Sequence, residues 1–497
     1  MEPVVTPEAM ADADRRTIAA GTPEPVLVDR AGRAVAWQAR RLLGAAYGAR
    51  VVVACGKGNN GADGLVAARV LLGWGVRAEV VELATGAVDR AAVGRAIGRA
   101  RLAVDAMYGT GFRGDLEGDA AWFASTVAAA GVPVLAVDVP SGVDGLTGAV
   151  RGSAVRAHTT VTFAARKPGL LFEPGRTHAG EVHVADIGID LGDAGGRAHA
   201  APPIAVLDAR DVARALPPRP ASTHKWASGV MVVGGSGGMT GAPTLASHAA
   251  MRAGAGLVVC GLPGRTAARH ASGTEVITRA LPDVDDGMLA RAAVDVVLET
   301  VERFRSVAVG PGLGGNDETR AAVRELVPQV PAPLVLDADG LNAMVGVLTP
   351  LQARAAVGRV TVVTPHDAEY ARLAGEPVGE DRIDAARRLA ARSGAVVLLK
   401  GATTVVADPA DGRVLLNPTG TPALASAGTG DVLTGIVAAF LSRGMPAPIA
   451  AAVAAWVHGR AAQAVGPGLV AGDVVAALAP TLAAVSSDGR AEEPHGR

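Results

Sequence analysis

The sequence predicts an α/β protein with two doubly wound domains, each built on a mostly parallel sheet. Short, continuously apolar and β-branched runs alternate with Ala-, Leu- and Arg-rich stretches along the chain. Continuous hydrophobicity within a strand indicates a sheet that is covered on both faces, as parallel sheets with crossover helices are. The alternation restarts after the proline-rich segment "LPPRPAS" at residues 216–222, which indicates a second domain of the same class.

Each apolar run is interpreted as one strand and each Ala- and Leu-rich stretch as one helix. In the first half, we expect strands at 49–55, 77–83, 101–107, 132–139 and 159–165, and helices at 64–73 and 119–131. In the second half, we expect strands at 229–235, 256–262, 306–312, 333–339, 360–365, 395–401 and 403–408. Two long helical segments, 430–444 and 447–466, close that half.

The domain boundary is expected at the proline-rich segment, because its prolines stiffen an extended backbone and remove hydrogen-bond donors. The prediction is a first domain at 1–215, a linker at 216–223 and a second domain at 224–482. The polar end of the chain, 483–497, is expected to be a disordered tail.

Composition excludes several classes of protein. Hydrophobic residues make up 49% of the chain and charged residues 19%, which suits large cores rather than disorder. A net charge of −1, with no block of Lys and Arg, argues against a nucleic-acid partner. Cys55 and Cys260 each end an apolar run, so we expect two buried thiols in a reducing compartment. No apolar stretch is long enough for a membrane span, and we expect a soluble, cytoplasmic homo-oligomer.

Three polar loops of the first half directly follow predicted strands. They are "GKGNNGADG" at 56–64, "DAMYGTGFRGD" at 105–115 and "DVPSGVDG" at 138–145. Ligands of open α/β sheets bind at the carboxyl ends of strands. Glycines there permit positive φ and close approach to a phosphate or ribose, and the start of the following helix favours an anion.

Four side chains of these loops suit chemistry at that edge. Asn60, Asp105 and Ser141 offer hard oxygen donors, which suit an alkali or alkaline-earth ion better than zinc. Asp138 ends a strand and would direct its carboxylate into the same crevice. Each feature alone has a plainer explanation, since a Gly/Asn-rich turn can be only a turn and a strand-end Asp can be only a cap. Their succession at consecutive strand ends favours a ligand site.

Together with "DRAGRAVA" at 29–36, these loops resemble the NAD(P)H-hydrate epimerases. The resemblance implies a Rossmann-like fold, a potassium ion and a hydrated nicotinamide dinucleotide as ligand. It places Asp138 in the catalytic crevice and the potassium ion on Asn60, Asp105 and Ser141. Ala62 stands where that family usually has glycine. The residues implied to bind the dinucleotide, besides Asp138, are Asn59, Asn60, Gly61, Ala62, Asp63, Gly109, Thr110, Gly111, Phe112, Arg113, Gly114 and Asp115.

The second half contains "ALASAGTGDVLTGI" at 423–436. Gly428, Thr429 and Gly430 would present backbone N–H groups at the start of a helix, with Asp431 in its first turn. Such amides neutralise charge on a migrating phosphoryl group, while a carboxylate accepts the proton of the attacking hydroxyl. The alternative is that Asp431 only complements the helix dipole.

Flanking segments also suit a nucleotide. "KGATT" at 400–404 offers a lysine and two hydroxyls for a phosphate, and "TPHDAE" at 364–369 carries His366 and Glu369 after a strand. His366 can equally be a structural histidine. No Walker A motif occurs, so the second half is not a P-loop enzyme.

The second half resembles the ribokinase-like superfamily, and within it the ADP/ATP-dependent NAD(P)H-hydrate dehydratases. The motifs are "VVGGSGGMTGAP" at 232–243, "VGPGLG" at 309–314, "LDADGLN" at 336–342, "TPHDAE" and "AGTGD" at 427–431. The resemblance implies that Ala242, Gly312, His366 and Asp431 bind the hydrated dinucleotide. The residues implied to bind the adenine nucleotide are Lys400, Gly401, Ala402, Thr403, Thr404 and Gly430. We expect ADP and Mg²⁺ as cofactors of this half; Trp226 stands where glycine is expected after Lys225.

Together the resemblances imply repair of hydrated NAD(P)H. The first half would interconvert the R and S epimers, and the second would dehydrate the S epimer with ADP, releasing AMP and phosphate. Asp431 would take the proton of the C6 hydroxyl as that oxygen attacks the terminal phosphoryl group. One alternative remains open, namely a kinase of a small vitamin-precursor alcohol with a non-catalytic N-terminal ligand-binding domain, because it uses the same "GTGD" chemistry.

Overall fold

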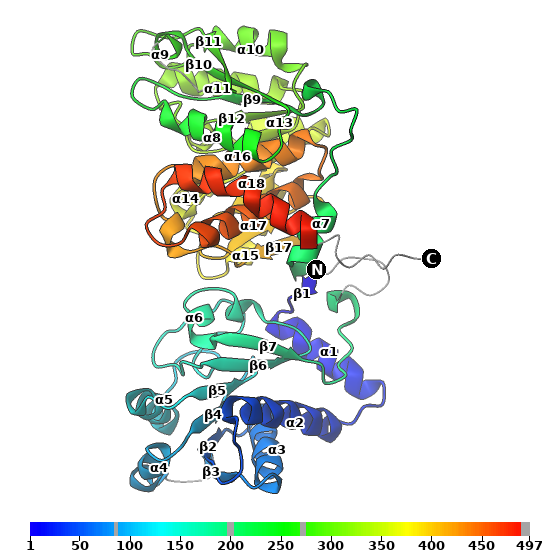
Figure 1. Ribbon diagram of the computed structural model, residues 1–497, viewed down its shortest axis with the longest axis vertical. Helices are drawn as coiled ribbons and strands as arrows, with labels where there is room; N and C mark the ends of the chain where they lie inside the picture. Colours follow the sequence, from blue (N-terminus) through cyan, green and yellow to red (C-terminus); the bar gives the residue numbers. More distant parts are fainter. Residues whose placement is uncertain (84–87, 196–202, 269–274, 489–497) are drawn as a thin grey trace. The chain divides into compact units, whose positions relative to one another are not determined.

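The computed structural model describes residues 1–83, 88–195, 203–268 and 275–488 of the chain. Two compact units are present, an N-terminal unit at Glu2–Ile204 and a C-terminal unit that contains Met1 and the residues from Ala205 onward. Each unit is a sheet of mainly parallel strands with helices on both faces (Figure 1), so the predicted fold class is confirmed. No helix among the described residues is long and apolar enough to cross a membrane.

The sheet of the N-terminal unit is wholly parallel, in the order β3–β2–β4–β5–β6–β7. The strands of this unit are β1 (Glu2–Pro3), β2 (Arg50–Cys55), β3 (Arg77–Glu82), β4 (Leu102–Ala106), β5 (Val134–Val137), β6 (Thr159–Phe163) and β7 (Glu181–Ala185). Its α-helices are α1 (Pro7–Ala19), α2 (Glu24–Leu43), α3 (Asn59–Gly73), α4 (Arg90–Ile97), α5 (Gly118–Ala130) and α6 (Gly175–Ala179).

The central strand β2 shows why this sequence forms a doubly covered sheet. Val51 and Val53 pack into the core that α2 and α3 cover, whereas Val52 and Ala54 pack into the core that α4 and α5 cover. Because successive side chains of a strand point to opposite faces, a continuous apolar run is what such a strand requires. Cys55 ends the strand as a buried free thiol, as predicted.

The sheet of the C-terminal unit runs in the order β8–β17–β16–β15–β14–β13–β12–β9–β10–β11. Only the pairs β15–β16 and β16–β17 are antiparallel among those whose register is described. The strands are β8 (Ile204–Val206), β9 (Gly229–Val233), β10 (Leu257–Pro263), β11 (Ile277–Leu281), β12 (Ser306–Val309), β13 (Leu334–Leu336), β14 (Thr361–Val363), β15 (Val396–Leu399), β16 (Thr404–Ala407) and β17 (Val414–Asn417).

Helix α16 is the central helix of this unit, and it packs directly against α8 (Figure 1). Its inner residues share one apolar core with α8, α17 and α18. The α-helices of the unit are α7 (Ala209–Ala215), α8 (Gly241–Arg252), α9 (Gly264–Ala267), α10 (Ala293–Val301), α11 (Asp317–Gln329), α12 (Asp339–Ala343), α13 (Thr349–Ala356), α14 (Asp367–Ala374), α15 (Arg382–Ser393), α16 (Thr429–Ser442), α17 (Ala447–Val465) and α18 (Ala471–Asp488).

The end of the chain differs from the prediction. Residues 483–488 of the expected disordered tail continue helix α18, while 489–497 lie outside the described residues. The helix extends this far because Val474, Leu478 and Val485 recur at helical spacing and are buried in the core. The polar sequence "SSDGR" at 486–490 led to the prediction of disorder, although the apolar residues before it recur at helical spacing.

The division between the units also lies earlier in the chain than the proline-rich segment. It falls between Ile204 and Ala205, because α7 packs against α17 and α18. Arg443 of the C-terminal unit donates to the carbonyl of Pro217, which fixes the proline-rich segment to the same unit. The functional bounds 1–215 and 224–482 remain proposals.

Candidate active sites

The first candidate site lies at the strand ends where the topology of the N-terminal sheet reverses. Strand β2 has β3 on one side and β4 on the other, so the connections leaving β2 and β4 diverge and leave a crevice between them. A cavity of about 480 Å³ opens there. The loops after β2, β4 and β5 line it, together with residues of α1 and α2.

The cavity brings together most of the residues predicted to bind a ligand in this half. On its wall are Asn59, Asn60, Asp63, Gly109, Thr110, Gly111, Phe112 and Asp138. The other predicted residues do not line it: Gly61, Ala62, Arg113, Gly114 and Asp115. Gly61 is required instead for packing, since a Cβ there would lie 2.0 Å from the carbonyl oxygen of Gly56.

Asp138 and Lys167 form a buried ion pair on the cavity wall. The Nζ of Lys167 lies 2.7 Å from Oδ1 of Asp138 and donates to the hydroxyl of Thr162 and the carbonyl of Phe163. The other carboxylate oxygen, Oδ2, accepts the backbone N–H of Thr110 at 2.9 Å. Asp138 adopts φ +66°, an uncommon conformation for a non-glycine residue, and such strain persists where surrounding contacts hold it in place.

Asp63, in the first turns of α3, is a second acid of the same cavity. Asp63 is only 6% exposed to solvent. Burial raises the pKa of its carboxyl to about 8, and the like charges of Asp138 and Asp14 raise it further. Asp14, on α1, also lines the cavity, and burial raises its pKa as well. At neutral pH Asp63 is therefore mostly protonated, in a cavity that also holds an ion-paired carboxylate.

Of the three residues predicted to hold a cation, Asp105 and Ser141 are hydrogen-bonded to each other, and Asn60 lies near Gly109. Ser141 donates to Asp105 from its hydroxyl at 2.6 Å and from its backbone N–H at 2.8 Å. Burial raises the pKa of Asp105 to about 6, although bonds from Ser141 and Met107 oppose the rise. Asn60 lies near Gly109, where a Cβ would come within 3.0 Å of its Oδ1. Its buried Nδ2 has no hydrogen-bond partner among the described residues.

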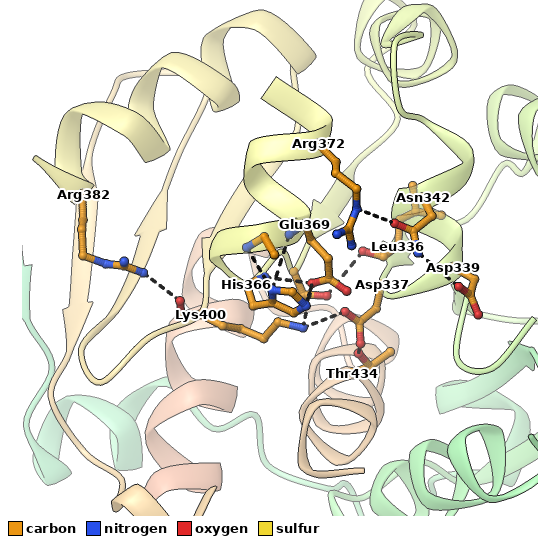
Figure 2. Close-up of polar contacts among 12 residues, drawn as sticks. Leu336, Asp337, Asp339, Asn342, His366, Glu369, Arg372, Arg382, Lys400 and Thr434 are labelled. Carbon is orange, nitrogen blue, oxygen red and sulfur yellow. Dashed lines mark hydrogen bonds and ion pairs between the residues drawn. The ribbon is translucent and has the colours of Figure 1, made fainter. Parts of the chain in front are cut away.

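The second candidate site surrounds Lys400, which follows β15 in the C-terminal unit. Figure 2 shows its ammonium group between two carboxylates, 3.0 Å from Asp337 and 3.4 Å from Glu369. The hydroxyl of Thr434, on α16, donates to the other oxygen of Asp337 at 2.6 Å. Burial alone would raise the pKa of Asp337, but Lys400 and the hydroxyls of Thr434 and Thr364 outweigh it and lower the pKa.

Helix α16 begins beside this lysine. Gly428 caps the helix at φ +90°, a conformation that suits glycine, and the hydroxyl of Thr429 fixes the turn by donating to the carbonyls of Leu424 and Ser426. A Cβ on Gly430 would lie 3.6 Å from Nζ of Lys400. The first amides of α16, which can donate to an anion, therefore lie beside the partly buried ammonium group of Lys400, whose charge Asp337 and Glu369 already balance.

Asp431 stands in the first turn of α16, as predicted. Burial raises the pKa of its carboxyl to about 7, and the negative charge of Asp337 adds to the rise while Lys400 opposes it. Among the described residues, the carboxylate makes no ion pair. An acid with a pKa near neutrality beside an anion site is suited to general-base work.

The remaining predicted residues of this half fall into different places. His366 caps α14, where its Nδ1 accepts hydrogen bonds from the N–H groups of Ala368 and Glu369. This ring nitrogen therefore has a structural role, which was the alternative to ligand binding. Ala242 and Gly312 come together, since a Cβ on Gly312 would lie 3.3 Å from that of Ala242. Of the "KGATT" segment, Gly401 and Ala402 are exposed, whereas Thr403 and Thr404 are buried.

The departure at Trp226 proves to be a packing feature. Its ring lies 5.5 Å from that of Phe304, and the guanidinium of Arg303 lies 5.2 Å from its centroid. Ala62 lies in α3 and does not line the cavity. Trp226 therefore makes packing contacts, and the methyl group of Ala62 does not narrow the cavity.

Sequence reasoning missed several polar residues of the two sites. Lys167 and Asp337 follow strands within the segments "ARKPG" and "LDADGLN", so position after a strand could have found them. Six buried polar atoms lack partners among the described residues. Those of Asn60 and Thr110 lie on the cavity of the N-terminal unit, and those of Ser426 and His458 belong to residues that contact Thr429 at the start of α16. Buried polar groups are normally paired, so these four atoms are available to a ligand.

Both units are similar to known proteins. The family described as NAD(P)H-hydrate dehydratase matches residues 230–479, and the one described as YjeF-related protein N-terminus matches residues 24–93 and 86–169. The bifunctional NAD(P)H-hydrate repair enzyme Nnr of Moorella thermoacetica is 40% identical over 473 residues, covering 88% of this chain and 88% of that protein. The enzyme of the same name from Salinibacter ruber is 41% identical over 507 residues, covering 93% and 92%.

A solved structure is also similar to the C-terminal unit. It is the ADP/ATP-dependent NAD(P)H-hydrate dehydratase of Bacillus subtilis, co-crystallized with ATP and Mg²⁺. The two are 28% identical, with a TM-score of 0.47, over 56% of this chain and 98% of that one.

Proposed function

This chain belongs to the family of bifunctional NAD(P)H-hydrate repair enzymes, and we propose that its N-terminal unit interconverts the R and S epimers while its C-terminal unit dehydrates the S epimer. The chain is an enzyme with isomerase and lyase activities, and ADP is consumed in the second. The observation that carries the proposal for the C-terminal unit is the position of Asp431. Its carboxyl, which makes no ion pair within the part of the chain that the structure describes, has a pKa of about 7 and stands beside the first amides of α16 and Lys400.

The dehydration proceeds by making a poor leaving group into a good one. Asp431 accepts the proton of the C6 hydroxyl as the hydroxyl oxygen forms a bond to the terminal phosphorus of ADP, and AMP departs. The amides of Gly430 and Asp431 and the ammonium of Lys400 would balance the charge on the moving phosphoryl group. The lone pair of the ring nitrogen then expels phosphate from C6, and loss of a proton from C5 restores the dihydropyridine.

Mg²⁺ fits the charge of this site. Asp337, Glu369 and Asp431 offer three carboxyl groups around one ammonium, that of Lys400, so a nucleotide diphosphate would add to an existing excess of negative charge. Glu369 would hold the ion together with the phosphates, and the ion would neutralise charge on the leaving AMP. The choice of ADP over ATP is part of the proposal.

A potassium ion fits the N-terminal unit, and we propose Asn60, Asp105 and Ser141 as its ligands. They supply amide, carboxylate and hydroxyl oxygens, the donors that hard cations prefer. Asp105 is fully buried, and among the described residues it has no lysine or arginine partner. The ion would supply the missing positive charge beside the loops that bind the dinucleotide.

The pKa of Asp431 predicts how dehydration depends on pH. A base works only when it is deprotonated, so kcat/KM for the S epimer should rise about tenfold per pH unit below about 7 and level off above it. Steady-state rates from pH 5.5 to 9 measure this profile, with parallel binding of ADP as the control. A rate that is flat across pH 7 contradicts the assignment of Asp431 as the base.

One experiment tests the whole function and its rival. The full chain is incubated with the separate R and S epimers, potassium, Mg²⁺ and either ADP or ATP, while the absorbance of the reduced nicotinamide is followed. Repair predicts recovery from both epimers with release of free phosphate. A kinase of a vitamin-precursor alcohol would instead leave the hydrates untouched, and in a parallel incubation with such an alcohol it would yield a stable phosphorylated alcohol.

We also propose that the chain forms a homo-oligomer. The N-terminal unit exposes large apolar side chains on and near α2 and α3, with Trp37 56% exposed and Leu72 53% exposed. Clustered exposed apolar groups commonly mark a protein interface. Light scattering of the full chain tests this, and a single-chain mass would contradict it.

A further inference from the structure

The cavity of the N-terminal unit holds two acids in different states. Asp138 is ion-paired with Lys167 at 2.7 Å, whereas the side chain of Asp63 makes no ion pair among the described residues. Both line the same cavity of about 480 Å³. Pairs of titratable groups whose surroundings push their protonation apart are typical of acid and base partners.

The backbone holds Asp63 in a fixed position. Helix α2 approaches α3 so closely at Gly32 that a Cβ there would lie 2.7 Å from the carbonyl oxygen of Asp63 and 2.5 Å from Cβ of Val66. Two residues earlier, α3 approaches Gly56 closely at Gly61, where a Cβ would lie 2.0 Å from the carbonyl oxygen of Gly56. These close approaches hold the backbone that carries Asp63 in one position, and general acid catalysis requires such a rigid support.

We infer that Asp63 is the catalytic acid of the epimerase and that it works with Asp138 as the base, the inference resting on the proposed epimerase function. Epimerisation needs temporary loss of the stereocentre at C6, and the hemiaminal at that carbon offers a route. Asp138 takes the proton of the C6 hydroxyl, the oxygen forms a C=O bond, and the C6–N1 bond breaks. The electron pair of that bond goes to N1, which takes the proton of Asp63.

The ring-opened aldehyde then exposes its other face by rotation about the C5–C6 bond. N1 attacks C6 from that face and returns its proton to Asp63, while the new hydroxyl takes its proton back from Asp138. Atoms and electrons balance, and no oxidant or further reactant is needed. The two carboxyl groups end in the protonation states in which they began.

Burial supports the assignment of the roles. Asp63 has a pKa of about 8, so it carries the proton that N1 requires at neutral pH. The charged or titratable groups that face the cavity around it are Asp14 on α1, Glu24 on α2, Lys57 before α3, Tyr108 after β4, Asp138 after β5 and Lys167 after β6. The acid form of Asp63 is lost above its pKa, so epimerisation should slow as the pH rises through about 8.

The test uses the full chain and two starting epimers. Recovery of reduced nicotinamide from the S epimer reports only the C-terminal unit, and recovery from the R epimer reports both units. For Asp63→Asn, we expect kcat from the R epimer to fall about 100-fold or more with KM within about twofold, down to the uncatalysed exchange, and the S rate to stay unchanged. Asp119→Asn, which removes a partly exposed carboxylate from α5, should leave both rates unchanged.

Three results separate the possibilities. If Asp63→Asn keeps full R-epimer recovery, or raises KM with kcat intact, then Asp63 is not the acid. If the parent protein shows the same R-epimer rate at pH 7 and pH 9, the inference also fails, whatever any variant does. If the parent never accelerates exchange between the epimers, the proposed epimerase function itself is wrong.

Discussion

Replacing Asp431 by asparagine is expected to slow ADP-dependent dehydration of the S epimer by about 10²- to 10⁴-fold, the usual contribution of a positioned general base. Asparagine keeps the size of the side chain and the start of α16 but cannot accept the proton of the C6 hydroxyl. The amides at the helix start and Lys400 remain, so ADP should still bind. The measurement is the rate of recovery of reduced nicotinamide absorbance at saturating ADP.

The matched control is Asp317→Asn. Asp317 is also an acidic residue in the first turn of a helix, α11, but it is solvent-exposed and pairs with Arg320 at 3.0 Å. This variant should dehydrate the S epimer at the parent rate. Equal rates for the parent and Asp431→Asn would show that Asp431 serves the helix dipole and not the chemistry.

Replacing Lys167 by methionine is expected to destabilise the N-terminal unit and to abolish its epimerase activity. The lysine is 1% exposed, and methionine would leave the carboxylate of Asp138 buried without its cation. Breaking a buried pair in this way costs about 3–5 kcal/mol of unfolding free energy. Native-state amide exchange of β5 and β6 measures that loss locally, without requiring the two units to unfold together.

A surface pair provides the control for this variant. Arg90 and Asp119 also lie 2.7 Å apart, but their side chains are 53% and 26% exposed. Arg90→Met should lower the unfolding free energy by less than about 1 kcal/mol, because water already screens that pair. Similar decreases in unfolding free energy for the two variants would contradict the prediction that the buried ion pair of Lys167 stabilises the unit more than an exposed pair does.

The fold could be predicted because each continuous apolar run corresponds to a strand that is buried on both faces of a sheet. Val51 to Cys55 read as a continuous run, and the structure packs alternate members of that run on opposite faces. The strands that escaped prediction lie mainly at or near sheet edges, as β7 and β11 do. Their residues, such as those at 277–281, are partly exposed, and the sequence there lacks a continuous apolar run.

Residues of the candidate sites could be predicted only where a glycine-rich turn or the end of a predicted strand lies next to them in the sequence. Asp431 and Asp138 stand directly beside glycine-rich turns or strand ends, so local sequence finds them. Lys167 and Asp337 matter through partners that are distant in sequence, as in the bond from Thr434 to Asp337 across 97 positions. No local pattern encodes such a contact, because the topology of the sheet creates it.

The separation of the chain into two compact units also affects how much of each catalyst a cell contains. The cavity with Asp63 and the cluster around Lys400 come from different stretches of one polypeptide, on either side of Ile204. Each completed translation therefore yields one isomerase and one lyase, and regulation of the gene cannot change their proportion. As the lyase consumes one stereoisomer, the isomerase, which is present in equal number, replenishes that stereoisomer from the other.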